Sequence, residues 1–263
     1  MTRSPLIVTT ESTEWLTNSY LVADRPGGRG VIVDSNGVLA PLLDAAREHD
    51  VTIEKLVLTH HHWDHVVSHA EDAEAAGGVP VVAAAETATL VEGVDETYAD
   101  GDVLRVGDLR IEARHTPGHC SDHHALVVTV EGQDGPPTLF SADVLFKGTV
   151  GGTFNGGPTG FAQLRTAITE RFADLPDDTD VRPGHREPTT LGAERSDNPF
   201  LRVWSGVDPE GDEPVTIVDL REDLDGPATL VLWAPDYDGG NKAWVRYADG
   251  RDVIVGGSRV KRD

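Results

Sequence analysis

The fold of this chain is decided by the stretch His60-His61-His62-Trp63-Asp64-His65, which follows the apolar run Leu56-Val57-Leu58. We expect a strand over 51–59 that ends at these histidines, because α/β folds place functional loops at strand ends. Imidazoles so close together repel one another when protonated, and a buried carboxylate without a partner is costly. A metal ion removes both costs, since zinc binds imidazole nitrogen and carboxylate oxygen at about 2.0–2.2 Å. We therefore predict a metal site here rather than an exposed histidine-rich loop.

Three more side chains of metal-ligand type follow predicted strands farther along the chain. They are His119 in Thr116-Pro117-Gly118-His119, Asp143 in Phe140-Ser141-Ala142-Asp143 and His185 in Arg182-Pro183-Gly184-His185. The strands before them are expected over 109–113, 138–141 and 180–182. One Pro-Gly-His sequence alone is weak evidence, but two of them together with the histidine block indicate a shared site.

The first 200 residues alternate between predicted strands and helices, which is typical of an α/β domain. Helices are expected over 41–49, 65–76, 86–91 and 161–173, with further strands over 30–34, 79–82 and 125–130. The pattern changes near residue 207, where a stretch rich in glycine, proline and acidic residues begins. Beyond it we expect only strands, over 215–218, 229–234, 243–247 and 253–255. We predict a hydrolase-type domain over 1–206 and a small all-β appendage over 207–263.

The composition limits the kinds of site and partner. A formal net charge of −23 disfavours nucleic acid and anionic membranes as partners, because cationic side chains dominate such binding. Cys120 is the one cysteine, so an intrachain disulfide and a zinc site of several thiolates are both excluded. No apolar run approaches the roughly 18 residues of a membrane span or forms a signal-peptide core, so we expect a cytoplasmic protein.

The order of these ligand-type residues resembles the metallo-β-lactamase superfamily, whose hallmark is His-x-His-x-Asp-His followed by a His, an Asp and a His. Within it, the chain is similar to the glyoxalase II branch of thioester hydrolases. Leu145-Phe146 after the Asp, and Asn198-Pro199-Phe200-Leu201-Arg202 after the last His, also match that branch. The resemblance covers about residues 6–202. It implies an αβ/βα four-layer sandwich with two mixed sheets, to which the C-terminal appendage is added.

The resemblance also implies two divalent metal ions per chain, with zinc expected first and iron or manganese left open. It assigns His60, His62 and His119 to the first metal, Asp64, His65 and His185 to the second, and Asp143 to a bridging position. Two such ions could share a water and lower its pKa, which supplies a hydroxide nucleophile that Asp64 would orient catalytically. The expected function is hydrolysis of thioesters or related small acyl esters.

Glutathione-specific relatives carry a basic residue nine positions after the bridging Asp, a Tyr two positions further, and a Tyr two residues after the last His. This chain has Gly152, Phe154 and Glu187 there. We therefore expect a small acyl substrate of another thiol or alcohol rather than S-lactoylglutathione. Lys147 and Phe154 are candidate substrate contacts, and the glycine-rich run 148–160 is expected to form a flexible loop at the mouth of the site.

Two other activities compete with this interpretation, and the sequence leaves the oligomeric state open. The stretch 116–123 also resembles nuclease-type members, and a phosphodiesterase could use the same two metals. A mononuclear iron persulfide dioxygenase is the other alternative, although Gly151-Gly152-Thr153-Phe154 does not match the Gly-Arg-Thr-Asp-Phe of those members. Other polar or aromatic residues nearby are expected to pack, or to orient a ligand, rather than to bind metal: His61, Trp63, Asp34, Asp122, His123 and His124.

Overall fold

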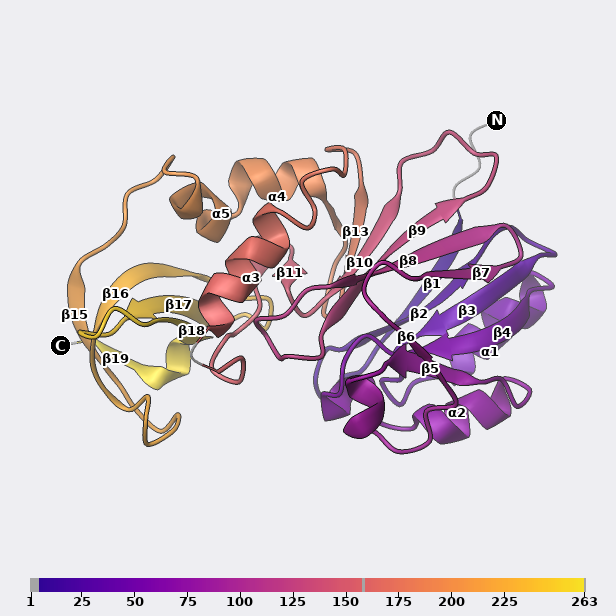
Figure 1. Ribbon diagram of the computed structural model, residues 1–263, viewed down its shortest axis with the longest axis horizontal. Helices are drawn as coiled ribbons and strands as arrows, with labels where there is room; N and C mark the ends of the chain where they lie inside the picture. Colours follow the sequence, from indigo (N-terminus) through magenta and orange to yellow (C-terminus); the bar gives the residue numbers. More distant parts are fainter. Residues whose placement is uncertain (1–4, 158, 263) are drawn as a thin grey trace.

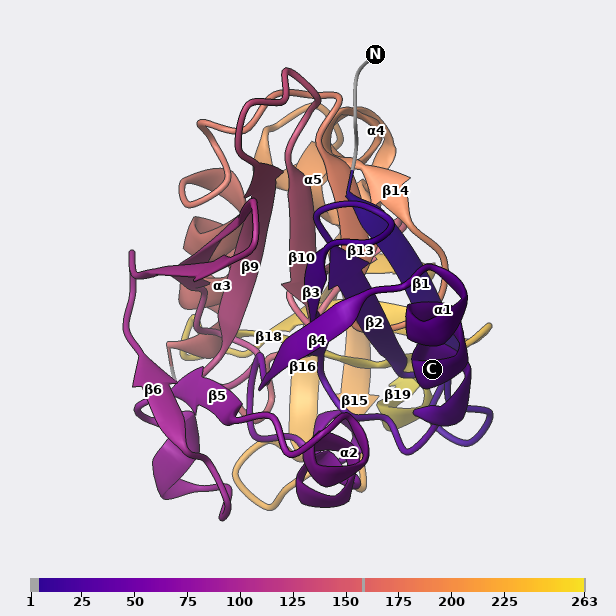
Figure 2. The ribbon, with the colours of Figure 1, turned by 90° about the vertical axis from the view of Figure 1, so that its right-hand side faces the viewer.

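The structure is a computed structural model that describes residues 5–157 and 159–262. Its first sheet has six strands in the order β1-β2-β3-β4-β5-β6 (Figures 1 and 2). The first three strands run antiparallel, whereas β3, β4, β5 and β6 run parallel, so the sheet is mixed. The strands are β1 (Leu6–Glu11), β2 (Asn18–Ala23), β3 (Arg29–Val33), β4 (Thr52–Val57), β5 (Val81–Ala84) and β6 (Glu96–Tyr98).

The second sheet has the order β14-β13-β10-β9-β8-β7 and is mixed because β10 and β13 pair in parallel. A two-stranded ribbon of β11 (Leu145–Phe146) and β12 (Thr149–Val150) follows β10. The strands of the second sheet are β7 (Val103–Val106), β8 (Leu109–His115), β9 (His124–Val130), β10 (Thr138–Ala142), β13 (Asp180–Pro183) and β14 (Thr189–Thr190).

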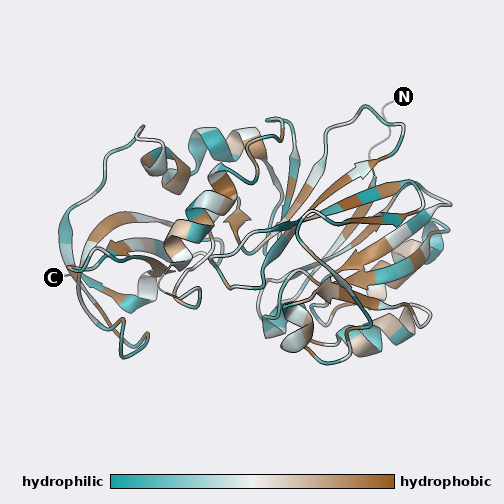
Figure 3. Cartoon of the chain, viewed as in Figure 1, coloured by the Kyte–Doolittle hydropathy of each residue, from teal (hydrophilic) through white to brown (hydrophobic). Residues whose placement is uncertain are grey.

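Alternation of side chains along the strands builds three apolar layers. Figure 3 shows hydrophobic residues recurring along the strands, with hydrophilic residues between them. In β2, Val22 faces the second sheet, where it packs in one cluster with Ile111 and Phe140. Its neighbour Leu21 lies on the opposite face of the sheet. There it belongs to a second apolar cluster with residues of the helices α1 (Ala40–Glu48) and α2 (His69–Ala75). The outer face of the second sheet packs against α3 (Gly160–Thr169), α4 (Leu191–Asp197) and α5 (Pro199–Trp204). The predicted four-layer αβ/βα sandwich is therefore confirmed.

The C-terminal region forms a five-stranded antiparallel sheet in the order β18-β17-β16-β15-β19. One face has its own apolar cluster, whereas Trp244 and Ile254 on the other face join Phe161 and Leu164 of α3 in the cluster beneath the second sheet. The predicted boundary at 206/207 falls between α5 and β15, and the division into two units stays a prediction. The strands are β15 (Glu213–Ile217), β16 (Gly226–Pro235), β17 (Asn241–Arg246), β18 (Asp252–Gly256) and β19 (Val260–Arg262).

Two predicted helices were wrong in extent. The helix expected over 65–76 is a 3-10 turn, Trp63–His65, followed by α2 from His69. The gap arises because Val67 N–H donates to the Ser35 carbonyl oxygen at 2.9 Å, which binds this segment to the end of β3. The helix expected over 86–91 is only the 3-10 turn Thr87–Thr89.

The glycine-rich run was also predicted incorrectly in its first part. Residues 148–153 include β12, and Thr153 N–H donates to the Ile254 carbonyl oxygen at 2.9 Å, so this part is packed against the C-terminal sheet. Residue 158 of that run lies outside the described residues. No helix in the described part of the chain is both long enough and apolar enough to cross a membrane.

Candidate metal centre

The seven predicted ligands meet at one edge of the sandwich, because each follows the end of a strand or lies in the 3-10 turn after β4. Their potential ligand atoms form two groups, each within 4.8 Å: His60, His62, His119 and Asp143 in one, and Asp64, His65 and His185 in the other. This is the grouping that the family resemblance implied. The sheet edge explains it, since strands far apart in sequence end side by side there.

Three buried polar atoms at the centre of this cluster have no hydrogen-bond partner among the described residues. They are Nε2 of His60, Nε2 of His65 and Oδ1 of Asp143. An unsatisfied buried polar atom costs about 1–3 kcal/mol, so proteins rarely leave one without a ligand. Two imidazole nitrogens and a carboxylate oxygen are a donor set for a divalent cation. The residues present therefore fit a metal.

Hydrogen bonds to the Nδ1 atoms of His60 and His65 fix which nitrogen of each ring faces the centre. His65 Nδ1 lies 2.9 Å from Asp34 Oδ2, and a carboxylate can only accept, so His65 carries its proton on Nδ1. Thr59 Oγ1 donates to the same Asp34 oxygen at 2.9 Å, and His60 Nδ1 lies 3.0 Å from that hydroxyl, so the hydroxyl accepts from His60. Both rings thus turn Nε2, the nitrogen that would bind a metal, towards the centre.

The remaining imidazoles are oriented by backbone carbonyl groups. His119 Nδ1 donates to the Gly152 carbonyl oxygen at 2.9 Å, and His185 Nδ1 donates to that of Trp15 at 3.0 Å. Each ring is left with Nε2 free to bind a metal. His62 is turned the other way, since its Nδ1 lies 2.8 Å from His119 Nε2. His62 would therefore bind through Nδ1.

Asp143 occupies the middle of the cluster, where a bridging ligand would be. Its Oδ1 lies 3.3 Å from His65 Nε2, and its Oδ2 lies 3.3 Å from His185 Nε2 and 3.5 Å from His119 Nε2. These histidines come from both groups. The Asp143 N–H donates to His123 Nε2 at 3.0 Å, so the buried His123 holds the backbone of Asp143 in place.

The backbone beside the ligands is held in conformations that are rare for side-chain-bearing residues. Asp34, Ala142 and Arg186 have φ of 58°, 40° and 63°, and such strain is characteristic of functional sites. Position 184 must be glycine because its backbone passes close to two ligands. A Cβ there would lie 2.2 Å from Asp143 Oδ1 and 2.8 Å from His65 Cε1. The Pro-Gly-His sequence thus lets the last ligand loop pass directly beside the carboxylate.

Burial and neighbouring charges set the protonation of the ligands. Burial holds the pKa of His60 well below its usual value and lowers that of His62 to about 4. Burial also opposes ionisation of Asp143, but His185 and His65 outweigh it and hold the carboxyl pKa well below its usual value. Metal binding needs neutral imidazole and ionised carboxylate, and His60, His62 and Asp143 are in that state near neutral pH. Against the effect of burial, Asp143 and Asp34 raise the pKa of His65, so a metal there would displace a proton.

Asp64 lies at the ligand cluster, whereas the two candidate substrate contacts, Lys147 and Phe154, lie on the surface and against the C-terminal sheet. Asp64 Oδ2 accepts a hydrogen bond from Thr17 Oγ1 at 2.7 Å and lies 3.6 Å from His185 Nε2. Lys147 is exposed between β11 and β12, and Phe154 packs against the apolar cluster of the C-terminal sheet. The roles of Lys147 and Phe154 in substrate binding stay predictions.

The structure also shows aromatic contacts around the ligand cluster that the sequence did not predict. Tyr237, from the C-terminal sheet, stacks on the His185 ring with centroids 4.6 Å apart and an interplanar angle of 13°. Trp15 and Trp63 pack edge to face at 4.6 Å, with 47% and 53% of their surfaces exposed. Trp63 therefore packs against Trp15, as expected, while about half of its surface stays exposed. No local pattern could reveal these contacts, because they join distant parts of the chain.

His61 and Asp122 form a separate support beneath the histidine block. The Asp122 carboxylate accepts from the backbone N–H of His61 at 3.0 Å, from its Nδ1 at 2.7 Å and from Thr87 Oγ1 at 2.8 Å. This arrangement ties the turn after β4 to the turn after β8.

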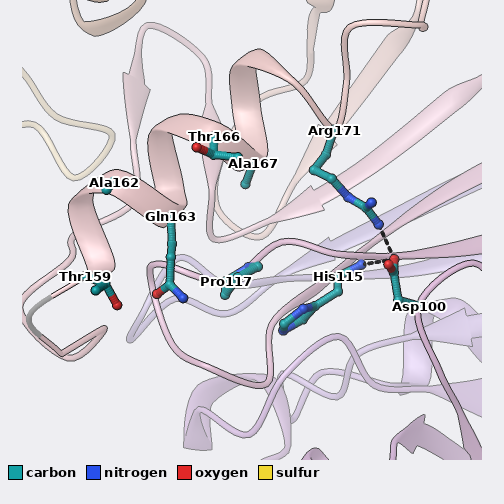
Figure 4. Close-up of a pocket in the computed structure, with 9 residues that line it drawn as sticks. All are labelled: Asp100, His115, Pro117, Thr159, Ala162, Gln163, Thr166, Ala167 and Arg171. Carbon is teal, nitrogen blue, oxygen red and sulfur yellow. Dashed lines mark hydrogen bonds and ion pairs between the residues drawn. The ribbon is translucent and has the colours of Figure 1, made fainter.

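A pocket of about 500 Å³ lies elsewhere, between α3 and the end of β8 (Figure 4). Its polar groups include Gln163, His115 and an ion pair between Arg171 and Asp100. None of the seven ligand-type residues lines it. This pocket is therefore separate from the ligand cluster.

Comparison with known proteins agrees with this geometry. A family model of the metallo-beta-lactamase superfamily matches residues 12–185. A hydroxyacylglutathione hydrolase of Polaromonas is 34% identical over 244 residues, which cover 78% of this chain and 85% of that protein.

Solved structures show the same fold. The crystal structure of ETHE1 from Myxococcus xanthus has a TM-score of 0.64 at 25% identity, covering 77% of this chain and 91% of that one. The structure of TTHA1623 in a di-iron-bound form has a TM-score of 0.57 at 27% identity, covering 74% and 100%. With its two groups of ligand-type residues around one shared aspartate, this chain belongs to the metallo-β-lactamase superfamily, whose members are generally metal-dependent hydrolases.

Proposed function

We propose that this protein hydrolyses thioesters or related small acyl esters with two divalent metal ions, zinc being the first expectation. The observation that carries the proposal is the pair of ligand groups around Asp143, with three buried donor atoms that lack protein partners. Similarity to a hydroxyacylglutathione hydrolase supports a thioester as the substrate class. The di-iron form of TTHA1623 keeps iron open as the metal.

His60, His62 and His119 would hold one ion, Asp64, His65 and His185 the other, with Asp143 between them. Bound there, two ions would acidify a water molecule and polarise the scissile carbonyl group.

The chain's own residues would prepare the site for that chemistry. Thr17 donates to Asp64 Oδ2 and so fixes the carboxylate, which would orient the attacking water or hydroxide. Asp34 and the Trp15 and Gly152 carbonyl groups keep three imidazoles in the tautomer that binds metal. A thiolate leaving group needs little protonation, so no separate general acid is required.

The rim of the site favours an uncharged substrate with an apolar part. Trp15 and Trp63 are half-exposed beside the ligand loops, and Trp15 is joined to His185 through its carbonyl group. Arg186, next to His185, pairs with Glu11 at 3.3 Å. The chain as a whole carries a net charge of −23, which repels anionic thiols such as glutathione. We propose a small-molecule acyl substrate and no nucleic acid partner.

The test is metal analysis of the purified protein combined with hydrolysis of a thioester panel that pairs charged and uncharged thiols with the same acyl group. The expected result is about two metals per chain, with faster turnover of the uncharged thioesters and none after chelation. Two metals without thioester turnover would contradict the proposal, and cleavage of a phosphodiester instead would identify the competing activity. One iron per chain with consumption of a persulfide and oxygen would identify a dioxygenase.

A further inference from the structure

Residues 150–153, which we call the strap, lie between the ligand cluster and the C-terminal sheet. On the side of the ligands, the Gly152 carbonyl oxygen accepts from His119 Nδ1 at 2.9 Å. The neighbouring Gly151 passes so close to the ligands that a Cβ there would lie 2.0 Å from the Asp143 carbonyl oxygen and 3.5 Å from His119 Nδ1. The position of the strap therefore sets the orientation of the His119 ring.

Three hydrogen bonds fix the other side of the strap to the C-terminal sheet, which in Figure 1 lies at the opposite end of the molecule from the first sheet. Lys242 Nζ, from β17, donates to the Val150 carbonyl oxygen at 3.0 Å. Thr153 N–H donates to the Ile254 carbonyl oxygen of β18 at 2.9 Å, and Thr153 Oγ1 accepts from Ile254 N–H at 2.9 Å. Since these bonds lie on both sides of Gly152 in the sequence, they restrict the movement of its carbonyl group.

Burial of the Lys242 ammonium group is unusual in this chain. Lys242 is 5% exposed, whereas the other three lysines are wholly or partly exposed. Its Nζ lies 3.0 Å from Asp236 Oδ1, and 5.4 Å and 5.1 Å from the rings of Phe146 and Tyr237. An apolar residue could fill the same space without the cost of burying an ammonium group. It could not, however, donate to the Val150 carbonyl oxygen.

We propose that the C-terminal sheet positions His119 for the first metal through the strap, with Lys242 as the positioning residue. The strap holds the Gly152 carbonyl group where His119 Nδ1 donates to it, and so keeps His119 Nε2 directed at the ligand cluster. Both Lys242 and Ile254 lie beyond residues 12–185, which match the family model. The proposal goes beyond thioester hydrolysis, because it concerns metal affinity and does not depend on the substrate.

The experiment measures the zinc affinity of the full chain by competition with a chromophoric chelator. Lys242→Met keeps a side chain of similar length that packs against both rings but cannot donate. Asp236→Asn is combined with it, so that no unpaired carboxylate stays buried. Loss of an outer partner of a metal-binding histidine lowers affinity about 10- to 100-fold, and Lys242 acts one step further away, so we expect the double variant to bind one of the two zinc ions about three- to tenfold more weakly.

Proton NMR of the zinc-loaded protein shows whether His119 is the ligand affected. The Nδ1 proton of His119 is identified by its absence in His119→Gln, and that of His65, which is bonded to Asp34 Oδ2, serves as the reference. In the double variant the His119 proton should exchange with solvent several-fold faster, whereas the His65 proton should not. Tyr247→Phe, which removes a hydrogen bond to the Leu224 carbonyl oxygen in the same sheet, is the matched control and should change neither zinc affinity nor either proton.

Thr153→Val tests the strap from its other end, and it decides the question if the double variant fails to fold. The substitution keeps the shape of the side chain, removes the acceptor for Ile254 N–H and should weaken the same zinc ion. Unchanged zinc affinity in either folded variant, equal weakening of both ions, or an unchanged His119 proton would overturn the role of the strap. The predicted loss of zinc affinity, in a protein that turns over no thioester, would leave this inference standing and overturn the proposed function.

Discussion

Replacement of Asp34 by asparagine tests how the structure prepares the second metal position. The substitution keeps the shape of the side chain and changes one acceptor into a donor. Asp34 Oδ1 accepts from Thr59 N–H at 2.8 Å, and Oδ2 accepts from both Thr59 Oγ1 and His65 Nδ1 at 2.9 Å. An asparagine that keeps the bond to Thr59 N–H must place its NH₂ group against His65 Nδ1.

Two donors cannot face each other at 2.9 Å, so His65 must move or transfer its proton to Nε2. That nitrogen is the one that points into the ligand cluster without a protein partner, and a protonated Nε2 cannot bind a metal. Loss of a carboxylate that orients a metal-binding histidine typically lowers metal affinity about 10- to 100-fold, which is about 1.4–2.7 kcal/mol. We expect Asp34→Asn to weaken the second metal by this amount and the first metal less.

The assay is competition with a chromophoric chelator, which resolves the two binding steps, with metal analysis after dialysis. Asp24→Asn is the matched control. Asp24 is a buried carboxylate that accepts from the backbone N–H groups of Arg29 and Asp108, away from the ligands. It should lose stability without a selective effect on either metal. Unchanged affinity of the second metal in Asp34→Asn, or an equal loss of both metals, would refute the reasoning.

Three further predictions concern the ligands and the rim. Asp143→Ala should lower bound metal below two per chain by metal analysis, and unchanged content would rule out the bridging assignment. Trp63→Ala should raise KM several-fold for thioesters of an aromatic thiol but not for those of a small polar thiol, whereas the equally exposed Leu90→Ala should change neither. Metal-free protein should be most stable to urea near pH 6.5. Burial lowers the pKa of His62 to about 4 in the folded state. Below pH 6.5 the unfolded state therefore binds this proton more readily than the folded state does, and stability falls towards pH 4. Against the effect of burial, Asp143 and Asp34 raise the pKa of His65 in the folded state. Above pH 6.5 the folded state holds this proton more tightly than the unfolded state does, and the stability it contributes is lost as pH rises further. A flat profile would contradict these assignments.

The location of the candidate site could be predicted from the sequence because its residues lie in short motifs. The spacing of His60, His62 and His65 depends only on local geometry, and the remaining ligands each follow an apolar strand. Apolar alternation likewise predicted most strands of the two sheets, because burial of one face requires it. Helix ends were less predictable: whether the segment after His65 continues as a helix depends on its contact with Ser35, which is distant in sequence.

By itself, the sequence determined the superfamily and which seven side chains are available as ligands, since a local motif suffices for these. The four-layer architecture then followed from the resemblance to that superfamily. Only the tertiary structure decided how the ligands are oriented and what surrounds them. Asp34 reaches His65 across 31 residues, and the Trp15 carbonyl group reaches His185 across 170. Tyr237 comes to His185 from a sheet that showed no sign of belonging to the site. Hydrogen bonds and ring stacking act over a few ångströms, so such partners are set by which strand ends and turns the fold brings together, and no local pattern records that.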